Sequence, residues 1–155
     1  MKTRPRIYSA GKPIYAPLFR ELRQKHGFNI NARWIDLSDD TAKNKALVWE
    51  LCHRDASDCQ MLNIWNGNFD DDLRGTLVEA GHAMGNMSPV YSIGRSKNIS
   101  PDSHSDCAFT FHPTLWYFTQ NTTLLEGYKE AEAHYIRNFQ LPRVPITTQQ
   151  RAAKK

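Results

Sequence analysis

Apolar residues follow two different spacings along this chain. Residues 60–67, QMLNIWNG, form a short apolar run that stops at Asn-Gly, which indicates a buried strand followed by a turn. In residues 122–139 the apolar side chains recur with the 3.6-residue period of an amphipathic helix. Runs of the first kind predict strands at residues 6–11, 29–37, 60–67, 88–94 and 107–113. Periodic segments predict helices at residues 17–27, 46–58, 75–87 and 122–139.

The predicted elements follow the order β-α-β-α-β-α-β-β-α. This alternation is typical of an α/β fold of three layers, with a mostly parallel five-stranded sheet between helices, as in Rossmann-like or flavodoxin-like proteins. We expect one domain over residues 1–155, with its core at about 6–139 and a tail at 140–155. Ligands of such sheets bind at the carboxyl ends of the strands. Three loops should therefore meet there, at residues 9–13, 66–72 and 93–98.

Charge and hydropathy narrow the possible partners. The formal net charge is +4, and much of the excess lies near the two ends of the chain, whereas Asp70, Asp71 and Asp72 stand together in the middle. A basic stripe interleaved with aromatic residues, typical of nucleic-acid binding, is missing from the sequence. No apolar run approaches the length of a membrane span. We therefore expect a cytoplasmic protein that binds neither a nucleic-acid polymer nor a membrane.

The three cysteines, Cys52, Cys59 and Cys107, are odd in number and lack the C-x-x-C spacing of zinc or redox sites. They are expected to be reduced thiols with packing roles. His53, Cys52 and Cys59 do not form two closely spaced pairs of metal ligands, so we expect no metal site. We also expect no cofactor. Trp34 and Trp65 fit a place in the core, with stacking on a base as the alternative.

The segment LRGTLVEAGHAMG, residues 73–85, holds one carboxylate among small and apolar residues. A buried carboxylate is costly unless it is paired, and burial raises its pKa. The predicted topology places Glu79 near the start of the helix after the third strand, at the ligand edge of the sheet. Glu79 is thus either a solvated residue near a helix N-terminus or a carboxylate held in a cleft for chemistry.

Several segments in order resemble the nucleoside 2-deoxyribosyltransferases and their relatives, the deoxynucleotide N-glycosidases. The motif D-x-x-G-T-L-V-E-A-G-H-A-M-G, residues 72–85, precedes the strand PVYSIG and carries most of the resemblance. Weaker pieces are IYSAGKP at residues 7–13, RDASD leading into QMLNIW at 54–65, and FHP at 111–113 near Trp116. The resemblance covers roughly residues 6–139. It implies the Rossmann-like fold and a homo-oligomer whose active sites are shared between subunits.

The resemblance implies that Glu79 is the nucleophile. A carboxylate can attack C1′ of a 2′-deoxyribose as the glycosidic bond breaks, as in retaining glycosidases. The leaving base needs a proton, for which Asp72 is the first candidate and Asp71 and Asp70 are the alternatives. The transferases place this aspartate six residues before the glutamate, where the present chain has Leu73. Small residues around Glu79, including Gly75, are expected to let the sugar approach closely.

Other residues are expected to contact the substrate. Glu50 corresponds to a base-contacting acid of the transferases, and Asp55 competes for that role; the alternative for both is a solvated helix face. Tyr15, just beyond the loop at residues 9–13, is a candidate to stack on a nucleobase, and Asp36 either touches ligand or caps the next turn. His82 shares a helix face with Glu79. The expected substrate-binding set is Ser9, Gly11, Tyr15, Asp36, Glu50, Asp55, Asp71, Gly75 and His82.

Together these features predict an enzyme of nucleobase salvage that cleaves the N-glycosidic bond of a 2′-deoxynucleoside and transfers the sugar to another base. The acidic residues before Glu79 favour free nucleosides, because they would repel a phosphate. Arg95, Ser96 and Lys97 instead offer a phosphate grip, which leaves a 5′-monophosphate hydrolase as the alternative. A third possibility, from another class, is a non-catalytic nucleotide-sensing module on the same fold.

Overall fold

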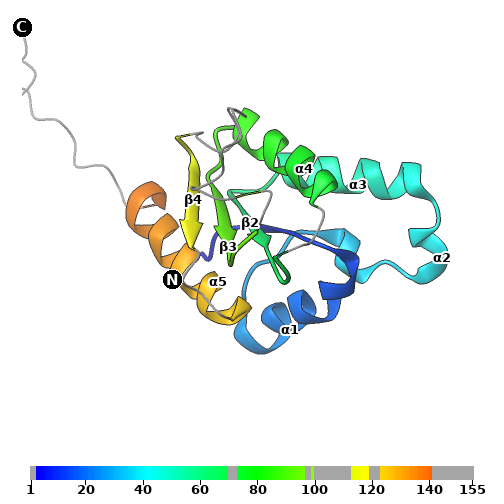
Figure 1. The fold of residues 1–155 in the computed structure, drawn as a ribbon, viewed down its shortest axis with the longest axis horizontal. Coiled ribbons are helices and arrows are strands. Elements are labelled where there is room, and N and C mark those ends of the chain that lie inside the picture. The colour runs from blue at the N-terminus through cyan, green and yellow to red at the C-terminus, as the bar shows by residue number, and fades with distance from the viewer. Residues whose placement is uncertain (1–2, 70–72, 97–98, 100–112, 119–122, 141–155) are drawn as a thin grey trace, which may run out of the picture.

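The computed structural model describes residues 3–69, 73–96, 99, 113–118 and 123–140. Four parallel strands form one sheet in the spatial order β1-β2-β3-β4 (Figure 1). They are β1 (Ile7–Ala10), β2 (Met61–Trp65), β3 (Val90–Ile93) and β4 (Leu115–Phe118). Five α-helices connect and cover them: α1 (Ala16–His26), α2 (Asp39–Ala42), α3 (Lys45–Ser57), α4 (Arg74–Gly85) and α5 (Leu124–Tyr135).

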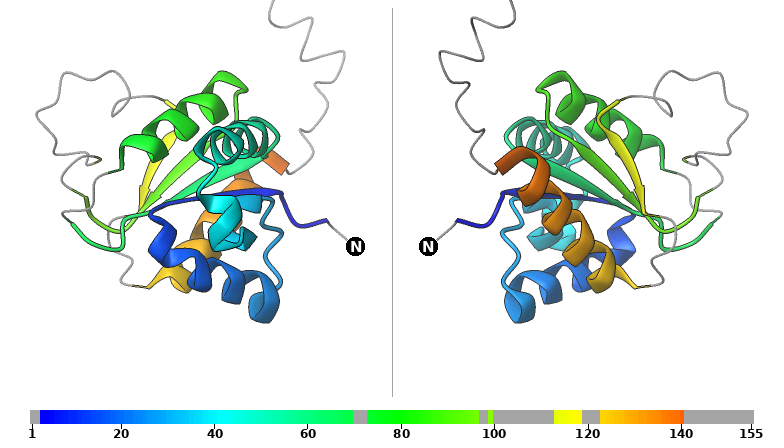
Figure 2. Two further views of the ribbon diagram at one scale, coloured as in Figure 1. Left: turned by 90° about the vertical axis from the view of Figure 1, so that its right-hand side faces the viewer. Right: turned by 90° about the vertical axis from the view of Figure 1, so that its left-hand side faces the viewer.

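The helices lie on both faces of the sheet, which gives the expected three layers. Helices α3 and α4 cover one face and α1 and α5 cover the other (Figures 1 and 2). All residues of β1 and β3 are buried, as the apolar runs predict for strands enclosed on both sides. The predicted α/β architecture is therefore confirmed. Among the described residues, no helix combines the length and hydropathy needed to cross a bilayer.

The five-stranded prediction is wrong for residues 29–37. Only Ile30 pairs with the sheet, through a single parallel bridge to Ile7 on the outer side of β1. Beyond it the chain turns into a 3₁₀ helix, Arg33–Asp36, because the backbone N–H of Arg33 donates to the carboxylate of Asp55 at 2.9 Å rather than to a strand. The buried apolar residues of this turn, Ala32 and Ile35, are three positions apart, as in a 3₁₀ helix, whereas alternation predicts a strand.

The predicted strand at residues 107–113 lies outside the described residues except for Pro113. The last described strand, β4, begins two residues later at Leu115, and the carbonyl of Thr114 accepts the N–H of Val90 at 2.8 Å. Proline has no N–H to donate to a ladder, which fits a described strand that begins after Pro113.

Local signals at the helix ends are confirmed. Gly27 closes α1 in the left-handed conformation, with φ at 69°. The polar stretch before α3 provides caps, since the Ser38 hydroxyl accepts the Thr41 N–H and the Asn44 side chain accepts the Leu47 N–H. These caps separate α2 from α3, whereas the sequence predicted one helix from residue 46. Helix α3 then packs against α4.

Gly127 allows α5 to lie directly on the sheet. A Cβ added there would overlap the Cγ2 of Ile93 on β3. We expect Gly127→Ala to lower the free energy of unfolding by about 2 kcal/mol because the helix must move away from a packed strand. At Gly81, on α4, a Cβ meets nothing within 4 Å, so Gly81→Ala should raise stability by about 0.5–1 kcal/mol. Urea unfolding of both variants checks the contrast, and equal effects would contradict this packing.

Candidate functional site

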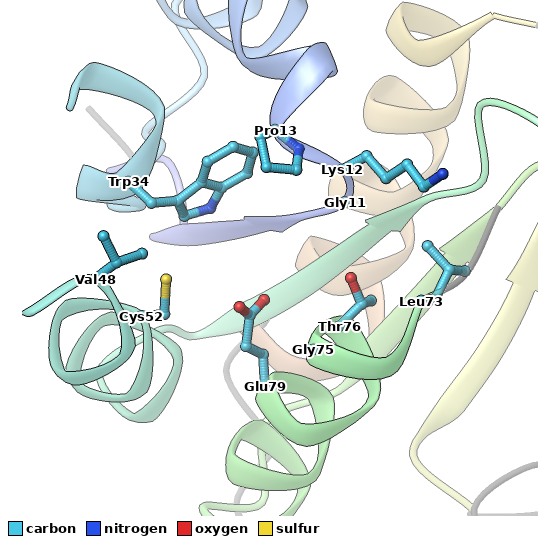
Figure 3. A pocket seen from close by; sticks show the side chains of 10 residues that line it. All are labelled: Gly11, Lys12, Pro13, Trp34, Val48, Cys52, Leu73, Gly75, Thr76 and Glu79. Carbon is cyan, nitrogen blue, oxygen red and sulfur yellow. The ribbon is translucent and has the colours of Figure 1, made fainter. Parts of the chain in front are cut away.

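A pocket of about 240 Å³ opens at the carboxyl end of β1, between the loop that follows this strand and helices α3 and α4 (Figure 3). The loop contributes Gly11, Lys12 and Pro13, and the 3₁₀ helix Arg33–Asp36 contributes Trp34. The remaining lining residues are Val48 and Cys52 from α3, Leu73 before α4, and Gly75, Thr76 and Glu79 from α4. The pocket is therefore at the edge of the sheet where the topology predicts a ligand.

Glu79 is the carboxylate of this pocket. Its position on the second turn of α4 brings the side chain under the loop after β1, and its carboxylate points into the pocket (Figure 3). Burial raises the pKa of Glu79 to about 7, and side-chain interactions with Tyr8 and Cys52 oppose this rise because they favour the charged form. Glu79 therefore changes its charge near neutral pH, which a solvated glutamate would not do.

Two neutral groups approach Glu79 from neighbouring elements. Tyr8 on β1 is fully buried, and its hydroxyl makes no hydrogen bond of good geometry within the described part of the chain. Burial and the Glu79 charge raise the pKa of Tyr8 well above its ordinary value. Cys52 on α3 is 7% exposed, and burial raises the pKa of its thiol to about 11. Both groups keep their protons at neutral pH and can donate them to the carboxylate.

The beginning of α4 forms the other side of the pocket. Leu73 occupies the N-cap position and offers no side-chain cap to the first turn. Thr76 is 6% exposed, lines the pocket and makes no side-chain hydrogen bond to another described residue (Figure 3). Lys12 lines the same pocket, with its amine pointing away from Glu79 (Figure 3). A helix N-terminus with a hydroxyl and a nearby cation can accept a negatively charged group.

Three residues expected at the site do line the pocket, namely Glu79, Gly11 and Gly75. The glycines of α4 leave open space beside the helix. A Cβ added at Gly75, Gly81 or Gly85 would meet no heavy atom of another described element within 4 Å. At Gly75 the open space is the pocket, whereas Gly81 lies on the exposed side of α4.

Two other expected substrate contacts, Ser9 and Asp36, have structural partners instead of lining the pocket. Ser9 is buried on the opposite face of the sheet, where its hydroxyl bonds to that of Tyr128 on α5. Asp36 forms a two-pronged ion pair with Arg23 on α1, with both N–O distances at 2.7 Å. The hydrogen bonds from Arg23 lower the pKa of the Asp36 carboxyl. Asp36 therefore ties α1 to the 3₁₀ helix rather than touching the pocket.

The two acids of α3 likewise fall outside the pocket. Asp55 is buried and binds Arg33 through the backbone N–H and the guanidinium, with N–O distances of 2.8–3.2 Å. Glu50 is exposed and pairs with Arg54 one turn later at 2.6 Å. Asp55 holds the chain after Ile30 against α3, and Glu50 lies on the solvated helix face that was its alternative.

Tyr15 and His82 also point elsewhere. The ring of Tyr15 packs edge-on against Trp65 at 6.5 Å between centroids, close to Gly67. His82 contacts His53 of α3 at 4.3 Å between ring centroids and helps to hold the two helices together. Neither lines the pocket.

The two described residues of the possible phosphate grip after β3 also do not line the pocket: Ser96 is buried and Arg95 is exposed.

Some expected residues lie outside the described part of the chain. They are the acid candidates Asp70, Asp71 and Asp72, together with Lys97, Cys107 and most of the tail. The three aspartates lie in the sequence between β2 and α4. Leu73, the next residue along the chain, lines the pocket. The assignment of a proton donor to this loop thus remains a prediction.

Sequence reasoning missed several lining residues. Val48 and Cys52 are one helical turn apart, and Thr76 precedes Glu79 by three residues, so each pair shares a helix face. That spacing could have found them. Trp34 was assigned to the core; it packs edge-on against Phe19 but also lines the pocket. Its indole N–H donates to the carbonyl of Ser9 at 2.9 Å, which fixes the ring beside the loop after β1.

Comparison of the chain with protein-family models, with curated proteins and with solved structures gave no match. The pocket itself is therefore the basis for a functional argument.

Proposed function

We propose that this protein cleaves the N-glycosidic bond of 2′-deoxynucleosides and transfers the deoxyribosyl group to another base, with Glu79 as the nucleophile. The observation that carries the proposal is a carboxylate, with its pKa raised to about 7, pointing into a pocket at the carboxyl edge of a parallel sheet. The motif resemblance around residues 72–85 supplies the reaction class. The substrate is a small molecule, and the same resemblance favours a homo-oligomer.

The reaction takes place in two displacements. A carboxylate oxygen of Glu79 attacks C1′, the C1′–N bond breaks, and its electron pair leaves with the base, which takes up a proton from an acid such as Asp72. A nitrogen of the second base then attacks C1′ and gives its proton to the carboxylate left at that acid, while the ester bond breaks and its electrons return to the Glu79 carboxylate. If water takes the place of the second base, the outcome is hydrolysis.

The pocket has features that suit these steps. Its walls at Trp34, Pro13 and Val48 are largely apolar and offer a surface for a planar base. Tyr8 and Cys52 both favour the charged form of the carboxylate, which is the form that attacks. A volume of about 240 Å³ suits a sugar-sized group, with the base reaching toward the open side.

The test is an exchange assay with deoxyinosine and free adenine. Formation of deoxyadenosine supports the transferase. Release of deoxyribose without exchange supports a nucleosidase with the same nucleophile. The proposal fails if neither reaction occurs across the common deoxynucleosides and their 5′-monophosphates. Binding of a nucleotide without turnover, retained in Glu79→Ala, would instead indicate the sensing module.

The start of α4 favours a second candidate, a 2′-deoxynucleoside 5′-monophosphate N-glycosidase. The first turn of α4, with the Thr76 hydroxyl and Lys12 in the same pocket, offers donors and positive charge to a phosphate. For this candidate, Thr76→Val should lower kcat/KM for a 5′-monophosphate about tenfold because one hydrogen bond to a charged group is lost. Activity on the free nucleoside is the internal control, and an equal loss on both substrates would contradict phosphate binding by Thr76.

A further inference from the structure

Cys52 stands next to the proposed nucleophile but has no part in the reaction described so far. Its side chain comes from α3, whereas Glu79 comes from α4, so the two helices bring the thiol and the carboxylate together. Both line the same pocket, and Figure 3 shows the sulfur of Cys52 beside the carboxylate of Glu79. Glu79 is the one carboxylate among the described lining residues of this pocket, so the thiol of Cys52 lies beside the group that the proposal assigns to attack.

We propose that Cys52 is a positioning residue, whose S–H group donates to the Glu79 carboxylate and orients it for attack. The catalytic role of this contact rests on the proposed function, whereas the contact between the Cys52 thiol and the Glu79 carboxylate does not. Burial keeps the Cys52 thiol protonated at neutral pH, since it raises the pKa to about 11. The thiol therefore acts as a donor and not as a competing nucleophile.

A thiol is well suited to this task. An S–H group is a weaker donor than a hydroxyl, so it can orient a carboxylate without withdrawing much of its nucleophilicity. It also presents an apolar surface that limits the access of water. Tyr8 approaches the same carboxylate from β1, fully buried and without a well-formed hydrogen bond of its own among the described residues. The two donors thus approach Glu79 from different elements, which restricts the rotation of its carboxylate.

The charged and titratable groups around Glu79 determine the pH at which its carboxyl titrates. Tyr8 faces it from β1 and Cys52 from α3, and both favour its charged form. Lys12 lines the pocket from the loop after β1, with its amine directed away (Figure 3). On α4 itself, His82 contacts His53 on α3. Of the two cysteines described, Cys59 provides a matched control, because its buried thiol donates to the carbonyl of Ala56 at 3.1 Å and does not line the pocket.

The experiment titrates the Glu79 carboxyl directly, by ¹³C NMR of protein labelled at the glutamate side-chain carboxyl, with Glu79→Gln to assign the signal. Cys52→Ala should move the midpoint upward by about 0.5–1 pH unit, because a donor to the charged form is lost. Cys52→Ser, almost the same size, should move it downward, and Cys59→Ala should leave it unchanged. Unchanged midpoints in both Cys52 variants would overturn the proposal, even if they unfold at a lower temperature.

Turnover provides the second measurement. At pH 6, Cys52→Ala should lower kcat/KM about threefold to tenfold relative to Cys59→Ala, and the loss should shrink by about pH 9, where Glu79 is mostly ionised in every variant. A loss that is equal at all pH values, with the NMR midpoint of Glu79 unmoved, would indicate a structural role and would overturn the proposal. If the NMR midpoints move but no variant turns over a deoxynucleoside, the contact stands and the proposed transferase fails.

Discussion

Replacing Glu79 by Gln should abolish turnover, with kcat/KM lowered by about 10³-fold or more, because an amide cannot form the ester to C1′. The side chain keeps its size, so the fold should be retained. Exchange between deoxyinosine and adenine measures the rate, and mass spectrometry of wild-type protein quenched during turnover should detect a deoxyribosyl adduct on the peptide that contains residue 79.

Glu50→Gln is the matched control for this substitution. Glu50 is an exposed carboxylate on α3 that pairs with Arg54 and does not line the pocket. Its loss should change kcat/KM by less than about twofold. If Glu79→Gln keeps most of the activity, the nucleophile lies elsewhere. If Glu50→Gln is the more damaging substitution, the base-contacting role that the resemblance implies for this acid would hold after all.

The activity should depend steeply on pH below neutrality. Burial raises the pKa of Glu79 to about 7, and the nucleophile must be ionised to attack. Protonation therefore removes the active form as the pH falls. We expect kcat/KM to decrease about tenfold for each pH unit below pH 7 and to level off above it.

Initial rates of base exchange in buffers from pH 5 to pH 9, at constant ionic strength, check this profile. The acid limb reports the free enzyme when kcat/KM is plotted. Unfolding monitored over the same range controls for loss of the native state. A rate that stays flat between pH 5 and pH 8 would show that Glu79 titrates at the ordinary value of a glutamate, near 4.5, or that another group attacks.

The sequence predicts elements well where a single spacing dominates. The amphipathic pattern of residues 122–139 becomes α5, and the apolar run at 60–67 becomes β2, since each pattern admits one buried arrangement. It predicts residues 29–37 poorly, because their alternation predicts a strand, whereas Asp55 stabilises a 3₁₀ turn. The turn depends on a carboxylate more than twenty positions away, which no local pattern contains.

The residues of the candidate site also differ in how far the sequence alone predicts their position. Glu79 stands out locally, as one charge among small and apolar neighbours, and the structure places it in the pocket. Asp36 and Asp55 look equally available in the sequence, yet Arg23 and Arg33 pair with them in three dimensions. Tyr8 reaches Glu79 only because β1 lies beneath the two helices, and this depends on the tertiary structure.

The buried carboxyl of Glu79 also ties the stability of the fold to the charge of the proposed nucleophile. The folded chain binds a proton at Glu79 more tightly than an unfolded chain, whose glutamate has a pKa near 4.5. From about pH 4.5 to about pH 7 the native state therefore holds more protons, and this group's contribution to stability is lost as the pH rises through that window. The ionised form, which the proposed reaction requires, is thus the less stable form of the resting protein. A neutral ester on Glu79 would remove the buried charge and relieve that penalty until the sugar departs.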